Sequence, residues 1–158
     1  MTKREAYEAC YRDITAIWKE EGGVALDDIA LMATINSVLA SRFDHFNWTG
    51  FYRVCGGRLV VGPYIGRPGC LQIDFGRGVC GAAAAKRQTV IVPDVTKFPG
   101  HIACDPASRS EIVVPVFGPA GELLAVLDVD SDRLAAFDDE DREGLETIAG
   151  LFRAGAKA

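Results

Sequence analysis

The spacing of the apolar residues changes from a helical to a strand period after Phe43, and this change limits the folds that the chain can adopt. Over residues 3–21 and 28–39, apolar side chains return at the period of a helix with one buried stripe, and Asp27 supplies an N-cap for the second helix. Beyond Phe43, aromatic and β-branched residues come in short runs that are typical of strands. Helices followed by strands predict an α+β domain in which both helices pack on a common sheet.

Glycine-rich turns divide the rest of the chain into short elements. Cys55-Gly56-Gly57 and residues 118–121 each separate two runs of strand-forming residues, which predicts two β-hairpins. The segment 93–110 has no clean period and contains several prolines, so we expect a long surface loop of the kind that often carries function. The expected elements are helices over residues 3–21 (stopped by Gly22-Gly23), 28–39, 79–86 and from about 138, and strands over residues 47–54, 58–65, 71–75, 89–92, 111–117 and 122–129.

Length and charge exclude several classes of protein. The chain has 158 residues, which suits a single domain over residues 1–158. Its formal net charge of -5 offers no basic surface for nucleic acid or for an anionic membrane. The chain has no uninterrupted run of about 18 apolar residues, so we expect no membrane span and a cytoplasmic protein.

The cysteines point to redox chemistry. Cys70, Cys80 and Cys104 lie in loop-like or glycine-flanked segments, where the backbone can approach a ligand closely. Five cysteines without close pairing, in a protein expected in a reducing compartment, argue against a disulfide framework. Cys10 and Cys55 have less informative surroundings, and we interpret them as structural or incidental.

Three acidic residues are candidates for a proton-donating site. Asp128 and Asp130 are two apart on a strand, so they share a face with Leu124 and Val126. Glu111 begins the strand over residues 111–117, which the predicted hairpin turn at 118–121 pairs with the strand that carries the two aspartates. Carboxylates crowded in a partly apolar cavity repel one another and lose hydration, so the pKa of at least one should be raised and it should keep its proton to higher pH than a free side chain. The alternative is that the two aspartates merely end a strand before a turn.

Other side chains allow both structural and functional interpretations. Trp48 and Tyr52 lie four apart on one strand face, where they fit an ordinary core or an aromatic wall for a methyl-sulfur group. Cys80 falls in the first turn of a helix, where the macrodipole favours either its thiolate or a bound carboxylate. A protonated His101 near Cys104 would favour the Cys104 thiolate.

A zinc site is only a minor alternative for these residues. Cys70, Cys80, His101 and Cys104 offer four ligands, but structural zinc sites usually contain cysteine pairs two to four residues apart, and the chain has none. The sequence therefore predicts no metal and no cofactor.

Five separated motifs agree in order and spacing with one known family. They are Asn47-Trp48-Thr49-Gly50-Phe51-Tyr52, Gly76-Arg77-Gly78-Val79-Cys80-Gly81, Gly100-His101-Ile102-Ala103-Cys104-Asp105, Ser110-Glu111-Ile112-Val113 and Leu127-Asp128-Val129-Asp130-Ser131. Together they resemble the GAF-domain free methionine-(R)-sulfoxide reductases. This resemblance spans nearly the whole chain, and it implies a central antiparallel sheet, helices mainly on one face and an enclosed ligand cavity.

The resemblance also implies an activity, the reduction of free methionine (R)-sulfoxide, with thioredoxin as the reductant and, by analogy, a homodimer. It assigns Cys104 as the nucleophile, Cys70 as the principal resolving thiol and Cys80 as a further thiol that joins disulfide exchange. Glu111, Asp128 and Asp130 would hold the polar groups of the substrate, and Trp48 and Tyr52 would line the pocket. The N-terminal end of the helix over residues 79–86 is our hypothesis for the site of the substrate carboxylate.

Two rival functions remain open at this point. A non-catalytic GAF module that senses a small molecule or redox state is the main one, because a fold hosts many functions. A sensor, however, has no need of a nucleophile with two possible resolving partners. A thiol peroxidase is weaker, since the sequence supplies no positive charge beside a peroxidatic cysteine.

Overall fold

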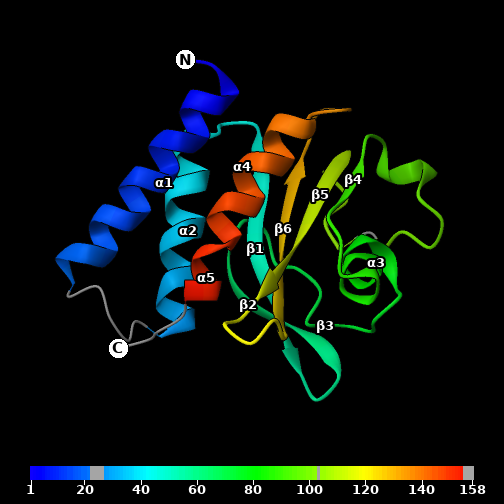
Figure 1. The fold of residues 1–158 in the computed structure, drawn as a ribbon. Helices are drawn as coiled ribbons and strands as arrows, with labels where there is room; N and C mark the ends of the chain where they lie inside the picture. Colours follow the sequence, from blue (N-terminus) through cyan, green and yellow to red (C-terminus); the bar gives the residue numbers. More distant parts are fainter. Residues whose placement is uncertain (22–26, 103, 155–158) are drawn as a thin grey trace.

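A single antiparallel sheet forms the centre of the protein. The computed structural model describes residues 1–21, 27–102 and 104–154. Six strands follow the order β3-β2-β1-β6-β5-β4, with every neighbouring pair antiparallel (Figure 1). Their bounds are β1 Phe46–Cys55, β2 Arg58–Ile65, β3 Gln72–Ile73, β4 Val90–Val92, β5 Ser110–Phe117 and β6 Leu123–Ser131.

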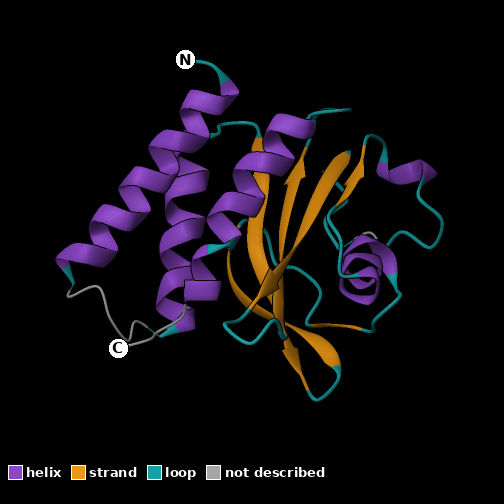
Figure 2. Cartoon of the chain, in the orientation of Figure 1, coloured by secondary structure: helices purple, strands orange, loops and turns teal. Residues whose placement is uncertain are grey.

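The helices divide unequally between the two faces of the sheet (Figure 2). α1 (Lys3–Glu20), α2 (Asp28–Arg42), α4 (Asp139–Ala149) and the short α5 (Leu151–Ala154) cover one face, and α3 (Gly78–Lys86) covers the other (Figure 1). The 3₁₀ helix η1 (Val95–Lys97) lies within the expected loop over residues 93–110. The predicted α+β arrangement, with helices mainly on one face, is confirmed.

Local signals explain where the helices begin. The Asp27 side chain accepts hydrogen bonds from the backbone N–H groups of Ile29 and Ala30, which confirms the predicted N-cap. Asp138 caps α4 in the same way, and the Asp141 side chain accepts a hydrogen bond from the Asp138 backbone N–H. The predicted stop at Gly22-Gly23 lies outside the described residues.

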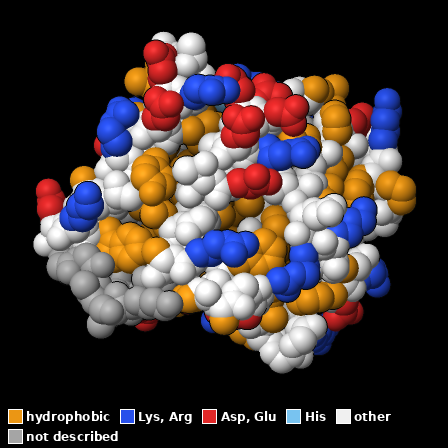
Figure 3. Space-filling model, in the orientation of Figure 1, with side chains coloured by type: hydrophobic (Ala, Val, Ile, Leu, Met, Phe, Trp, Pro, Cys, Tyr) orange, Lys and Arg blue, Asp and Glu red, His pale blue; other side chains and the backbone are white. Residues whose placement is uncertain are grey.

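Each face of the sheet has its own apolar core. The larger core fills the space between the sheet and α1, α2 and α4, and residues such as Ile14, Phe51 and Leu127 are fully buried in it. The smaller core packs α3 against the other face and includes Trp48 and Tyr52. Side chains of both charge signs, with apolar areas between them, cover the surface over α1 and α4 (Figure 3).

A β-bulge corrects one prediction about the β6 face. Val116 pairs with Ala125, but Phe117 pairs with Leu123, so β6 has one extra residue at this point. Leu124 consequently packs against the helix-side core, whereas Val126 belongs to the core under α3. The expectation that Leu124 shares a face with Asp128 and Asp130 is therefore wrong.

Candidate active site

A small cavity lies between the sheet, α3 and the loop that precedes β5. Its volume is about 30 Å³, which admits water but not an amino acid. Six of the predicted site residues line it: Tyr52, Cys80, Cys104, Glu111, Asp128 and Asp130. Ile73, Gly78, Val79, His101, Ile102, Asp105 and Ser108 complete the lining.

The three predicted acids meet in this cavity because strand pairing brings them together. Glu111 on β5 is directly opposite Asp130 on β6, and Asp128 follows on the same face of β6. Their relative exposures are 6%, 8% and 6%, and no ion pair between described residues involves them. β6 continues through Ser131, so Asp128 and Asp130 do not simply end a strand.

This burial changes the proton affinity of the acids. Burial, followed by the charges of Asp128 and Asp130, holds the pKa of Glu111 well above its usual range. Burial and the Asp128 charge do the same to the pKa of Asp130. Burial raises the pKa of Asp128 to about 6, although contacts with Glu111 and Cys80 oppose the shift. Such a cluster keeps protons to higher pH than free carboxyl groups do and can donate one.

Cys80 lies beside the acids, in the first turn of α3. Its Sγ and one carboxylate oxygen each of Glu111 and Asp128 all lie within 4.8 Å of one another. Burial and then the Asp128 charge raise the pKa of the Cys80 thiol well above its usual value. The possibility that the helix N-terminus stabilises a Cys80 thiolate is therefore not supported, because the acids and the lack of hydration outweigh the macrodipole.

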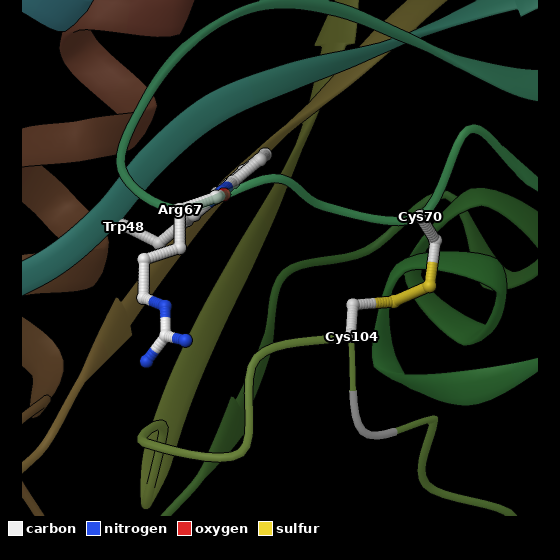
Figure 4. Close-up of a disulfide and its surroundings, with 4 residues drawn as sticks. All are labelled: Trp48, Arg67, Cys70 and Cys104. Carbon is white, nitrogen blue, oxygen red and sulfur yellow. A yellow bond between two sulfur atoms is a disulfide. The ribbon is translucent and has the colours of Figure 1, made fainter.

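Cys70 and Cys104 form a disulfide, with their Cα atoms 5.4 Å apart (Figure 4). The bond joins the loop after β2 to the loop before β5, across 34 residues of sequence. It is consistent with the pairing of a nucleophile with a resolving thiol that the resemblance implies. Cys10 and Cys80 are free and buried, and Cys55 is free and exposed.

A family model described as GAF domain matches residues 31–154. The chain belongs to the GAF domain family. The GAF fold expected from the sequence motifs is confirmed. No helix within the described ranges of this GAF domain is long and apolar enough to cross a membrane.

Named relatives resemble this GAF domain over most of their length. The free methionine-R-sulfoxide reductase of Escherichia coli is 40% identical, over 94% of this chain and 87% of that protein. GAF domain-containing protein A of Dictyostelium discoideum is 43% identical, over 96% and 92%. The solved structure of the free methionine-R-sulfoxide reductase from Neisseria meningitidis in complex with its substrate has a TM-score of 0.90 at 40% identity, and the match covers 99% of this chain and 91% of that one.

The two predicted aromatic residues take different positions in this GAF domain. Their rings stack with centroids 5.7 Å apart. Tyr52 lines the cavity, whereas Trp48 is not among the lining residues. The Trp48 ring instead stacks on Tyr64, and its indole N–H donates to the carbonyl of Arg67, in the loop that carries Cys70 (Figure 4). Trp48 therefore contacts the loop that carries Cys70 in this disulfide form.

The loop that carries Cys104 contains features that the sequence interpretation missed or misjudged. Burial lowers the pKa of His101, so the imidazolium proposed to activate Cys104 is disfavoured. Asp105 accepts hydrogen bonds from the Ala107 backbone N–H and from the side chain of Asn47. The Asp105-Pro106 pair, a common turn signal, was the available hint that this acid anchors the loop.

Proposed function

We propose that this GAF domain reduces free L-methionine (R)-S-oxide to L-methionine through a thiol and disulfide cycle in the cytoplasm. The observation that carries the proposal is the position of Cys104, which lines the same cavity as three buried acids. The likeness to reductases of that name supports it. A sulfoxide requires both groups, because a nucleophile attacks its sulfur while an acid protonates its oxygen.

The first step transfers the sulfoxide oxygen to the enzyme. The Cys104 thiol gives its proton to the acid cluster as its sulfur attacks the substrate sulfur and forms an S–S bond, while a protonated acid of the cluster donates a proton to the sulfoxide oxygen. After a second proton reaches that oxygen, the S–O bond breaks and the oxygen leaves as water. This water attacks the Cys104 sulfur and returns one proton to the cluster, so the S–S bond breaks, methionine leaves and Cys104 becomes a sulfenic acid. Asp130 and Glu111 are the best candidates for the donor, since burial raises the pKa of both carboxyl groups well above their usual range.

The next steps restore the thiols. The Cys70 thiol attacks the Cys104 sulfenic acid, so that water leaves and a disulfide forms. The disulfide between Cys70 and Cys104 supports this step. A dithiol, which we propose to be thioredoxin, then attacks the disulfide and forms a mixed disulfide with the enzyme. Its second thiol resolves this intermediate, so the dithiol is oxidised to a disulfide and Cys70 and Cys104 return to thiols. Cys80 is a free thiol on the cavity wall, from which it can join this exchange.

The cavity favours a free amino acid as the substrate. The acids pair with its ammonium group, and Tyr52, with the Trp48 ring stacked against it, offers an apolar wall for its methyl-sulfur end. The N-terminal end of α3 is our candidate for its carboxylate. A peptide-bound methionine sulfoxide lacks both charged groups. Because the cavity holds only about 30 Å³ in the disulfide form, we propose that reduction of the disulfide precedes substrate entry.

The rival function is a redox or ligand sensor without turnover. It differs from a reductase in one measurable respect, because a sensor binds or oxidises once and forms no product in quantity. The disulfide between two loops alone is compatible with both functions.

The deciding experiment offers the R and S epimers of free methionine sulfoxide, and of its N-acetylated form, with thioredoxin and its reductase. We expect many turnovers with the free R epimer, little or none with the other three, and complete loss in Cys104→Ser. The exposed Cys55 supplies a matched control, Cys55→Ser, with full activity expected. Activity that survives in Cys104→Ser, or a single turnover only, would contradict the proposal.

A further inference from the structure

A groove at the other end of β5 has no part in the proposed reaction. Its volume is about 430 Å³, within the range of sites that bind small molecules. It lies between α4, the end of β5 and the turn that joins α3 to β4. Phe117 lines the groove at the end of β5, and about 20 Å of strand separates it from Glu111 in the acid cluster. The groove is therefore distinct from the candidate active site.

This groove carries a local excess of positive charge. Three arginines line it: Arg87 from the turn after α3, Arg142 from α4 and Arg153 from α5. Glu146 is the only acid among the described residues of the lining, and one of its oxygens accepts a hydrogen bond from Thr89. In Figure 3, basic side chains lie on both sides of an apolar area near the end of α4. Although the whole chain has a net charge of -5, a concave site of this kind attracts anions.

Two of the three guanidinium groups contact the same aromatic ring. The Cζ atoms of Arg87 and Arg153 lie 4.8 Å and 5.0 Å from the centroid of the Phe117 ring. Neither side chain forms an ion pair within the part of the chain that the structure describes. Arg87 donates instead to the carbonyl oxygen of Gly121 at 2.6 Å. Like charges held on one ring repel each other, and an anion beside them would relieve this repulsion.

The third arginine has a donor atom without an acceptor. The Nε atom of Arg142 is buried and has no hydrogen-bond partner among the residues described. The Asp139 carboxylate oxygen is 3.8 Å away, which is too far for a hydrogen bond. Buried N–H groups nearly always have an acceptor, so this atom indicates that an oxygen of a ligand binds in the groove.

We propose that Arg87, Arg142 and Arg153 bind the phosphate group of a small organic phosphate. Guanidinium groups donate to phosphate oxygens in pairs, and they stay charged at every physiological pH. The groove is larger than a phosphate ion requires, so it has room for the organic part of the ligand. The proposal does not rest on the reductase function, because none of these arginines lines the active-site cavity.

The binding experiment uses the full chain and inorganic pyrophosphate as the probe, in titration calorimetry at low ionic strength. We expect one pyrophosphate per chain with a Kd of about 1 mM or tighter, and weaker binding as salt is added. Succinate, a dianion with planar carboxylates, should bind at least about tenfold more weakly, because it lacks the tetrahedral oxygens. No binding of pyrophosphate, or equal binding of succinate, overturns the proposal whatever the enzyme activity is.

Two variants and two matched controls place the ligand in the groove. Arg153→Gln should weaken pyrophosphate binding by about tenfold, since a charged donor is lost. Glu146→Gln should strengthen it several-fold, because the change removes the acid but keeps an oxygen that accepts from Thr89. Arg12→Gln and Glu143→Gln make the same charge changes at exposed positions outside the groove and should leave the Kd unchanged.

Urea unfolding shows that each variant is folded before its binding is compared. Weakening in Arg12→Gln equal to that in Arg153→Gln would mean that the anion responds to overall charge and not to the groove. An unchanged Kd in folded Arg153→Gln and folded Glu146→Gln would place the anion elsewhere. Either result overturns the proposal.

Discussion

The indole N–H of Trp48 donates a hydrogen bond of 2.9 Å to the carbonyl oxygen of Arg67, three residues before Cys70 (Figure 4). The loop wraps closely around this ring. A Cβ atom at Gly66 would lie 2.5 Å from the Trp48 ring, and one at Gly69 would lie 3.2 Å from it. Gly66 also has a φ of +141°, a conformation that side chains rarely adopt. Trp48 therefore fixes the loop that presents the Cys70 thiol to Cys104.

Replacing Trp48 with Phe should slow formation of the disulfide. The variant keeps an aromatic ring but loses the bond to Arg67, and a hydrogen bond of this kind contributes about 1 kcal/mol, or roughly fivefold in a rate. After one equivalent of substrate, a sulfenic-acid trapping reagent should label Cys104 several-fold more in Trp48→Phe than in the parent chain.

The matched control is Trp18→Phe in α1. Trp18 is the other tryptophan of the chain, and its indole N–H has no hydrogen-bond partner among the described residues. Trapping in Trp18→Phe should equal that of the parent chain. Equal trapping in Trp48→Phe as well would show that Trp48 does not position Cys70.

Asp130→Asn should remove most of the turnover. Loss of a general acid typically lowers a rate by about 100-fold or more. The pKa of Asp130 is raised well above its usual range by burial and the Asp128 charge, so the active, protonated form persists to higher pH than in a free aspartate and is lost as pH rises further. The alkaline fall in kcat/KM of the parent chain should therefore be absent in Asp130→Asn.

Asp132→Asn provides the control for this change, because Asp132 is exposed and only two residues away. It should keep the parent pH profile. If Asp130→Asn has full kcat and an unchanged profile, Asp130 is not the proton donor.

Asp128→Asn should stabilise the protein at neutral pH even though it impairs the site. Burial raises the Asp128 pKa from its ordinary value of 3.8 to about 6, so the folded chain keeps a proton that the unfolded chain has already lost. This contribution to stability is full below about pH 4 and lost as pH rises to about 6. Above that range, the amide should raise the free energy of unfolding by about 1 to 3 kcal/mol.

Urea unfolding of both chains at several pH values measures this effect. The difference between Asp128→Asn and the parent chain should grow from pH 4 to pH 6 and then level off. A difference that is constant with pH, or an Asp128→Asn chain that is less stable at neutral pH, would mean that a partner compensates the Asp128 charge.

Tyr7→Phe should lower stability without lowering activity. The Tyr7 hydroxyl donates to Oδ1 of the fully buried Asp141 at 2.8 Å, and Lys3 binds the other oxygen. Loss of the hydroxyl leaves a buried carboxylate oxygen without its donor, at a cost of about 1 to 3 kcal/mol in unfolding free energy. The cavity lies on the opposite face of the sheet, so turnover should not change.

Tyr11→Phe is the companion variant, because Tyr11 is a half-buried tyrosine on the same helix whose hydroxyl is in no hydrogen bond between described side chains. Its stability should remain near that of the parent chain. A loss of turnover in folded Tyr7→Phe would show that the two faces of the sheet are coupled.

The sequence predicted the features that depend on period and on local caps. The strand alternation that places Asp128 and Asp130 on one face also placed them in the cavity, and Asp27 and Asp138 marked helix starts correctly. The same alternation failed at Leu124, because a single extra residue in β6 reverses the face and leaves no mark in the hydrophobic pattern.

Contacts between segments far apart in the sequence could not be predicted from hydrophobic period or motif spacing. The Cys70–Cys104 pairing came from the resemblance alone, since 34 residues of sequence separate the two thiols. The environment of Cys80 was misjudged for a related reason. Its helix position favours an anion, but the two acids that approach it come from strands far along the chain.

The most direct test of the proposed reaction is a single turnover of the fully reduced chain with one equivalent of free methionine (R)-sulfoxide and no external reductant. We predict about one methionine released per chain, together with a Cys70–Cys104 disulfide identified by peptide mapping. Release of no methionine, or methionine release from a Cys104→Ser chain, would contradict the assignment of Cys104 as the nucleophile.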